Sequence, residues 1–162
     1  MPKQVIPFSD FVIATGVEHE KFINQLHGYL QENDCDAKIR EAANGYVVSY
    51  VHKPAARTVA NYVFRKKMPM LRVYADNVLS YMDIINNLPD SMKDTIKKGG
   101  TCSRLIDSTT CNSRCLKGFD FILDDERQQK CRCHMGFTFL LDDETKPHLM
   151  EIMKREIQAR LV

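Results

Sequence analysis

The sequence contains no long apolar run and none of the common nucleotide-binding or hydrolase motifs. No stretch approaches the roughly 18 apolar residues of a membrane span, and the opening residues, MPKQVIPFSD, lack the apolar segment of a signal peptide. The phosphate-binding loop and the GxGxxG, GxSxG and HExxH patterns are also missing, which lowers the expectation of nucleotide, serine-hydrolase and zinc-protease chemistry. We therefore expect a cytoplasmic protein without membrane contact, and a non-enzymatic role ranks above catalysis.

An excess of charge of either sign is missing as well. The chain has 23 Lys and Arg against 21 Asp and Glu, a formal net charge of +2, which argues against a strongly electrostatic partner such as nucleic acid. Apolar residues make up 44% and charged residues 27%, as in ordinary globular proteins. The length of 162 residues suits a single domain, 1–162, and Gly99–Gly100 offers an alternative division into halves 1–98 and 101–162.

Apolar periodicity in the first half predicts an α+β fold with an antiparallel sheet. After an irregular beginning over 1–14, the capping-box spacing Thr15–Glu18 starts a predicted helix that ends near Gln31. Alternation of apolar residues then predicts strands at 37–42, 46–52, 58–65 and 70–75. Asp76–Asn77 is expected to cap a helix over 78–87, and a short helix follows Pro89.

The second half repeats part of this order. Further strands are predicted at 118–123, 127–133 and 136–141, before an amphipathic helix that starts at Thr145. Residues 46–87 and 118–159 thus share a meander of three strands followed by a helix, which an internal duplication or a chance recurrence would explain. If the halves are duplicates, the groove between them is a natural ligand site.

Five of the six cysteines lie between Thr101 and Leu141, and three interpretations of this cluster stay open. In a reducing cytosol, metal ligation or thiol chemistry is expected over structural disulfides. A pair of thiolates with three residues between them, completed by distant ones, is compatible with a tetrahedral zinc site. The predicted metal ligands are Cys102, Cys111, Cys115 and Cys131, with Cys133 and His134 as alternates. The other interpretations are inert core thiols and reactive thiolates favoured by the neighbouring basic residues.

A basic turn between the third and fourth predicted strands is the candidate nucleic-acid interface. Its charges and nearby aromatic residues are Arg65, Lys66, Lys67, Arg72, Tyr62, Phe64 and Tyr74. Aromatic side chains on a basic sheet can stack bases, but the period of two places Tyr62 and Phe64 on the core face. A solvated hairpin turn is therefore favoured. The acidic triplets 124–126 and 142–144 are likewise expected to form turns, the second also placing negative charge at a helix N-terminus.

Four short runs in the second half of the chain carry a resemblance: Arg104–Asp107, Cys111–Cys115, Gly118–Phe121 and Gln129–Arg132. They resemble small uncharacterised cytosolic proteins of anaerobic Firmicutes with a cysteine-rich second half. The resemblance extends over about 63–160. It implies a bacterial protein with the same order of elements, and it implies no activity.

These features predict a non-enzymatic cytosolic binding module, with a structural zinc site or with a ligand groove between its halves. Its partner is a small molecule or another protein, and zinc is the one cofactor expected. Two alternatives come from other functional classes. One is a thiol-dependent redox enzyme, and the other is a weak binder of single-stranded nucleic acid.

Overall fold

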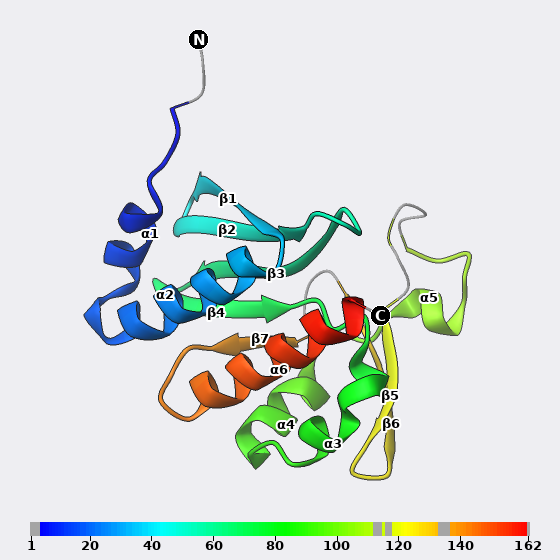
Figure 1. Cartoon of the computed structure of the whole chain (residues 1–162). Coiled ribbons are helices and arrows are strands. Elements are labelled where there is room, and N and C mark those ends of the chain that lie inside the picture. The colour runs from blue at the N-terminus through cyan, green and yellow to red at the C-terminus, as the bar shows by residue number, and fades with distance from the viewer. Residues whose placement is uncertain (1–3, 112–114, 116–117, 133–136, 162) are drawn as a thin grey trace. The chain divides into compact units, whose positions relative to one another are not determined.

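The computed structural model describes residues 4–111, 115, 118–132 and 137–161, and Figure 1 shows the chain as a ribbon. Helices and strands are mixed along these residues, which confirms the α+β class. In this described part, five strands form one antiparallel sheet in the order β1-β2-β3-β4-β7, and β5 pairs with β6 in a second sheet.

The chain divides into two compact units. Unit 1 comprises Met1–Leu71 and Leu140–Lys146, and unit 2 comprises Arg72–Phe139 and Pro147–Val162. The division therefore falls within a strand, whereas Gly99–Gly100 lies inside unit 2. The prediction of one domain over 1–162 stays a prediction.

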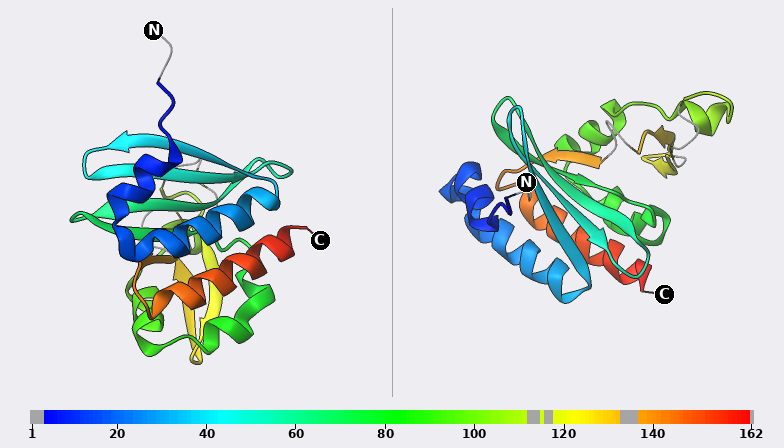
Figure 2. Two further views of the ribbon diagram at one scale, coloured as in Figure 1. Left: turned by 60° about the vertical axis from the view of Figure 1, so that its left-hand side comes forward. Right: turned by 90° about the horizontal axis from the view of Figure 1, so that it is seen from above.

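Unit 1 begins with two helices and continues with β-hairpins, which appear in Figure 2 as a long twisted ribbon. Its elements are α1 (Phe8–Thr15), α2 (Val17–Glu32), β1 (Cys35–Ala42), β2 (Gly45–His52), β3 (Arg57–Arg65) and the first part of β4 (Met68–Val73). The four predicted strands are confirmed to within three residues at each end. The tight β1–β2 turn depends on Gly45, because a Cβ there would lie 2.9 Å from the Phe64 ring and φ is 139°.

The first helix corrects the expected irregular beginning. Helix α1 has eight residues, and its buried Phe11, Val12 and Thr15 recur at helical spacing over little more than two turns, too short a run to stand out in the sequence. The predicted capping box is also wrong. The residue that precedes α2 is Gly16, with φ 101°, and it makes no side-chain cap bond. The Thr15 hydroxyl instead donates to the carbonyl of Val12 within α1.

The core of unit 1 is largely aromatic. The ring centroids of Phe11 and Tyr62 lie 5.1 Å apart, and those of Tyr50 and Tyr62 lie 6.0 Å apart. Because Phe11 belongs to α1 and Tyr62 to β3, these rings fix the helix on the sheet. Tyr62 and Phe64 are buried, as the period of two predicted.

Unit 2 contains short helices and the second sheet. Its elements are η1 (Val78–Tyr81), α3 (Met82–Asn86), α4 (Asp90–Lys98), α5 (Ser103–Ile106), β5 (Phe119–Leu123), β6 (Glu126–Lys130), most of β7 (Phe137–Leu140) and most of α6 (Thr145–Arg160). The helix predicted over 78–87 is present as a 3-10 turn followed by one α-helical turn. Its expected cap is wrong, because the Asn77 side chain makes no cap bond and binds Glu156 instead.

The structure does not confirm the internal duplication. The strand predicted over 136–141 was expected to complete a meander with β5 and β6, but β7 lies beside β4 in the larger sheet. Phe137, Thr138 and Phe139 of β7 are all buried. A strand that is buried on both faces suits a sheet covered on both sides better than the edge of a small hairpin. The two strand sets therefore differ in order.

Candidate functional site

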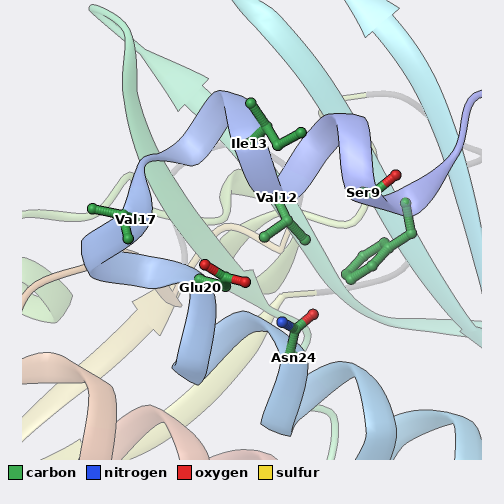
Figure 3. A pocket seen from close by; sticks show the side chains of 7 residues that line it. Ser9, Val12, Ile13, Val17, Glu20 and Asn24 are labelled. Atoms are coloured by element: carbon green, nitrogen blue, oxygen red, sulfur yellow. The ribbon is translucent and has the colours of Figure 1, made fainter.

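An open groove of about 520 Å³ lies between the helices α1 and α2 of unit 1 (Figure 3). Its lining residues are Phe8, Ser9, Val12, Ile13, Val17, Glu20 and Asn24. Figure 3 shows the Val12 side chain directed from α1 toward Glu20 and Asn24 of α2. The groove exists because Gly16 reverses the chain between the two helices with a positive φ, a conformation that favours glycine.

The rim of this groove is apolar and exposed. Ile13 is 78% exposed and Val17 is 84% exposed, although large aliphatic side chains gain free energy when they are buried. The lining also includes one carboxylate, Glu20, which is exposed and forms no hydrogen bond or ion pair with the described residues. The groove thus combines unburied apolar surface with one negative charge that has no partner within the described chain.

A half-buried histidine packs against one wall of the groove. The imidazole of His27 stacks on the Phe8 ring with centroids 3.7 Å apart and planes 14° apart. Its Nδ1 lies 2.8 Å from the hydroxyl of Tyr50. Burial lowers the pKa of His27 below its ordinary value, because a desolvated imidazolium is unfavourable. The His27 imidazole that stacks on Phe8 is therefore neutral at neutral pH.

The predicted zinc ligands lie in unit 2 in different environments. Cys102 is buried, Cys115 and Cys131 are half-buried, and Cys111 is exposed. Within the described ranges, no group of three or more His, Cys, Asp or Glu side chains is placed to hold a metal ion. The alternates Cys133 and His134 lie outside the described residues. The zinc site stays a prediction, and a melting curve unchanged by excess chelator would remove it.

Two of the predicted ligands flank one short ladder. Thr101 and Lys130 form an antiparallel bridge, with hydrogen bonds from the Cys102 amide to the Gln129 carbonyl at 2.8 Å and from the Cys131 amide to the Gly100 carbonyl at 2.7 Å. The Sγ atom of Cys102 accepts a hydrogen bond from the Gly118 amide at 3.2 Å. These contacts hold the start of the cysteine segment against β6.

Unit 2 also contains a buried carboxylate that sequence reasoning missed. Glu156 of α6 is fully buried. Its Oε1 accepts hydrogen bonds from the Asn77 amide at 2.9 Å and the Tyr81 hydroxyl at 2.8 Å, and its Oε2 accepts from Asn77 Nδ2 and Arg160 Nε, both at 2.8 Å. Burial raises the pKa of Tyr81 well above its ordinary value, and the nearby negative charge of Glu156 is the second-largest cause of the increase.

A second carboxylate extends this network. Asp76 accepts hydrogen bonds from both terminal guanidinium nitrogens of Arg132 and, at 3.0 Å, from Arg160 Nη2. Arg132 also lies over the ring of Tyr74, 5.4 Å from its centroid. The network joins two carboxylates to two guanidinium groups, so its charges balance. Since both carboxylates are bound by several donors, we interpret the network as a structural clamp.

Only one signal in the sequence pointed to this clamp. Glu156 and Arg160 are four residues apart on a predicted helix, the spacing of a helical ion pair. Asp76 and Asn77 were interpreted as a helix cap because acidic and amide residues favour that position. Their pairing with residues about 80 positions later depends on tertiary packing, and a local pattern does not contain it.

Comparisons with known proteins add no relative. No family model, no curated protein and no solved structure matches the chain.

Among the described residues, no helix is long and apolar enough to cross a membrane. Of the aromatic residues in the predicted nucleic-acid interface, Tyr62 and Phe64 are buried, and Arg132 lies over the ring of Tyr74.

Proposed function

We propose that the protein is a cytoplasmic, non-enzymatic binding module that holds an apolar, basic helical segment of a partner protein between α1 and α2. The observation that carries the proposal is the exposure of Ile13 and Val17 beside the unpaired carboxylate of Glu20. Exposed apolar patches with polar neighbours mark interaction sites on soluble proteins.

The openness of the groove favours a protein segment over a small molecule. A small-molecule pocket buries most of the surface of its ligand, whereas Ile13 and Val17 project from the rim and are about four-fifths exposed. A helix laid between two helices would cover both side chains at once, as in helix-in-groove recognition.

The negative charges near the groove favour a basic partner helix. Asp10, Glu18 and Glu20 on α1 and α2 are exposed, against one exposed basic residue, Lys21, in the same stretch. A lysine or arginine on the partner would find an opposite charge at Glu20, and an acidic partner would be repelled. Complementary charge mainly sets specificity and association rate, while the apolar rim supplies affinity.

The test uses the full chain and a labelled model helix of leucine and lysine, followed by fluorescence anisotropy. We expect saturable binding, and Ile13→Ser and Val17→Ser should each weaken it about tenfold or more, since burying an aliphatic side chain stabilises by about 1.5–3 kcal/mol. Leu79→Ser is the matched control, because Leu79 is an exposed apolar residue of unit 2. It should leave the affinity unchanged.

Three results would overturn the proposal. One is the absence of saturable binding by the leucine–lysine helix. Another is equal weakening by Leu79→Ser, which would indicate non-specific adhesion to exposed apolar residues. The third comes from sedimentation of the chain alone, where a dimer abolished by Ile13→Ser would identify a second copy as the occupant.

A further inference from the structure

The turn between β3 and β4 consists of two lysines in the left-handed backbone region. Lys66 has φ 50° and Lys67 has φ 63°. Both side chains are exposed, and neither ammonium forms a hydrogen bond or ion pair with any described residue. Arg65 and Met68 on either side are exposed as well. The tip of this hairpin therefore presents two uncompensated positive charges on an unfavourable backbone.

Lysine is an unexpected residue at these positions. A two-residue hairpin turn with positive φ at both residues favours asparagine and glycine, and non-glycine residues found there are mostly Asn, Asp or His. Strained backbone that nothing local compensates is enriched at functional sites. The two-residue connection between β3 and β4 imposes this geometry, but it does not account for lysine at both positions.

The same molecule contains a second turn of this kind with the opposite charge. Asp124 and Asp125 join β5 to β6 with φ of 49° and 64°. The carboxylate of Asp124 binds Lys93 Nζ at 2.9 Å and Lys97 Nζ at 3.1 Å. These lysines are four residues apart on α4, so one helical turn of spacing lets both reach the same carboxylate. The strained acidic turn is thus docked on a basic helix face.

We propose that the Lys66–Lys67 turn is a docking site for an acidic helix face of a partner protein, with carboxylates one helical turn apart. The arrangement is that of the acidic turn with the signs exchanged. Each lysine ammonium offers three donors, so one lysine can bind two carboxylates at positions i and i+4, as the single carboxylate of Asp124 binds both Lys93 and Lys97. This surface is separate from the α1–α2 groove and does not depend on the function proposed for it.

The surroundings of the turn favour a protein over a nucleic acid. Binding of single-stranded nucleic acid relies on aromatic side chains that stack the bases. Tyr62 and Phe64, the aromatic residues of β3 closest to the turn in sequence, are both buried. Two point charges at a hairpin tip therefore remain as the recognising groups.

The test measures binding of labelled model helices to the full chain at low salt. One helix has glutamates four apart on a single face, and the other has the same composition with its glutamates on opposite faces. Replacing the turn with Lys66→Asn and Lys67→Gly keeps its geometry and should weaken binding of the one-face helix about tenfold. The double variant Lys66→Arg, Lys67→Arg should retain it, and Lys38→Asn, an exposed lysine of β1, should have no effect.

Specific outcomes would overturn the proposal. These are no saturable binding of the one-face helix, equal binding of the two helices, or unchanged binding in the Asn–Gly variant. Tighter binding of a thymidine oligonucleotide than of the one-face helix, lost in the Asn–Gly variant, would identify a nucleic acid as the ligand. That result would contradict the inference.

Discussion

The two units use their charged side chains in opposite ways. In unit 1, the ion pairs of Lys53 with Asp36 and of Lys146 with Asp143 are long, at 3.8 and 3.9 Å. In unit 2, the ion pairs of Arg127 with Asp120 and of Arg160 with Glu156 are short, at 2.7 and 2.8 Å, and the second pair is buried. Unit 2 buries charge in its network of Asp76, Glu156 and Arg160, whereas unit 1 leaves Glu20, Lys66 and Lys67 without a partner among the described residues.

The contrast is the reason for proposing that unit 1 binds the partner. Surface ion pairs contribute little to stability. Leaving Glu20, Lys66 and Lys67 unpaired therefore costs unit 1 little stability and keeps these charges accessible to a partner. The buried charges of unit 2 are already bound, and removing one would leave its partner desolvated without compensation. Substitutions of charged residues should therefore reduce the stability of unit 2 and change the binding properties of unit 1.

The largest effect is expected at Glu156. Glu156→Gln removes the negative charge and places an amide donor against Asn77 Nδ2 or Arg160 Nε. Breaking a buried ion pair costs about 3–5 kcal/mol, and urea unfolding should show a loss of this size. Glu151→Gln, on the exposed face of the same helix, is the control. Equal stability of the two variants would break the comparison between the units.

A smaller loss is expected at Lys130. This buried lysine donates to the carbonyls of Lys97 at 2.6 Å and Gly99 at 3.0 Å, at the C-terminal end of α4. Lys130→Met would leave both carbonyls without this donor, which costs about 1–3 kcal/mol. Thermal unfolding of Lys130→Met is compared with that of Lys98→Met, which changes an exposed lysine of α4. No difference would mean that water replaces the ammonium.

The two charged turns should respond with opposite signs. Lys66→Asn with Lys67→Gly relieves left-handed strain and should raise the free energy of unfolding by about 1 kcal/mol. Asp124→Asn with Asp125→Gly relieves similar strain but removes the ion pairs to Lys93 and Lys97, so it should give a smaller gain or a loss. Chemical denaturation of both variants tests this. A larger gain at the acidic turn would refute the difference drawn between them.

The smallest effect concerns pH and His27. Burial lowers the folded-state pKa of His27 below 6.5, so the unfolded chain binds the proton first as the pH falls. Unfolding should therefore become easier below about pH 6.5, until the folded-state pKa is passed. His27→Gln should reduce this loss without abolishing it, because burial also lowers the pKa of His19. Denaturation at about pH 7.5 and about pH 5.5 gives the comparison, and an unchanged loss in the variant would exclude His27 as its source.

Local patterns predicted the strands and missed the sites. The alternation of Ala60, Tyr62 and Phe64 sufficed to place β3 and its buried face, because a strand's side chains alternate whatever its partners are. The groove was missed because α1 is short and was expected to be irregular. The basic turn was placed correctly, but its left-handed geometry follows from the two-residue connection and from no preference of lysine.

The most direct test of the account reverses the charge of the groove. Anisotropy would compare a leucine–lysine helix with a leucine–glutamate helix on the wild-type chain, on Glu20→Lys and on Glu32→Lys, which changes an exposed glutamate outside the groove. The account predicts that the wild type and Glu32→Lys prefer the basic helix and that Glu20→Lys prefers the acidic one. The same preference in all three proteins would contradict the claim that unit 1 selects its partner through this carboxylate.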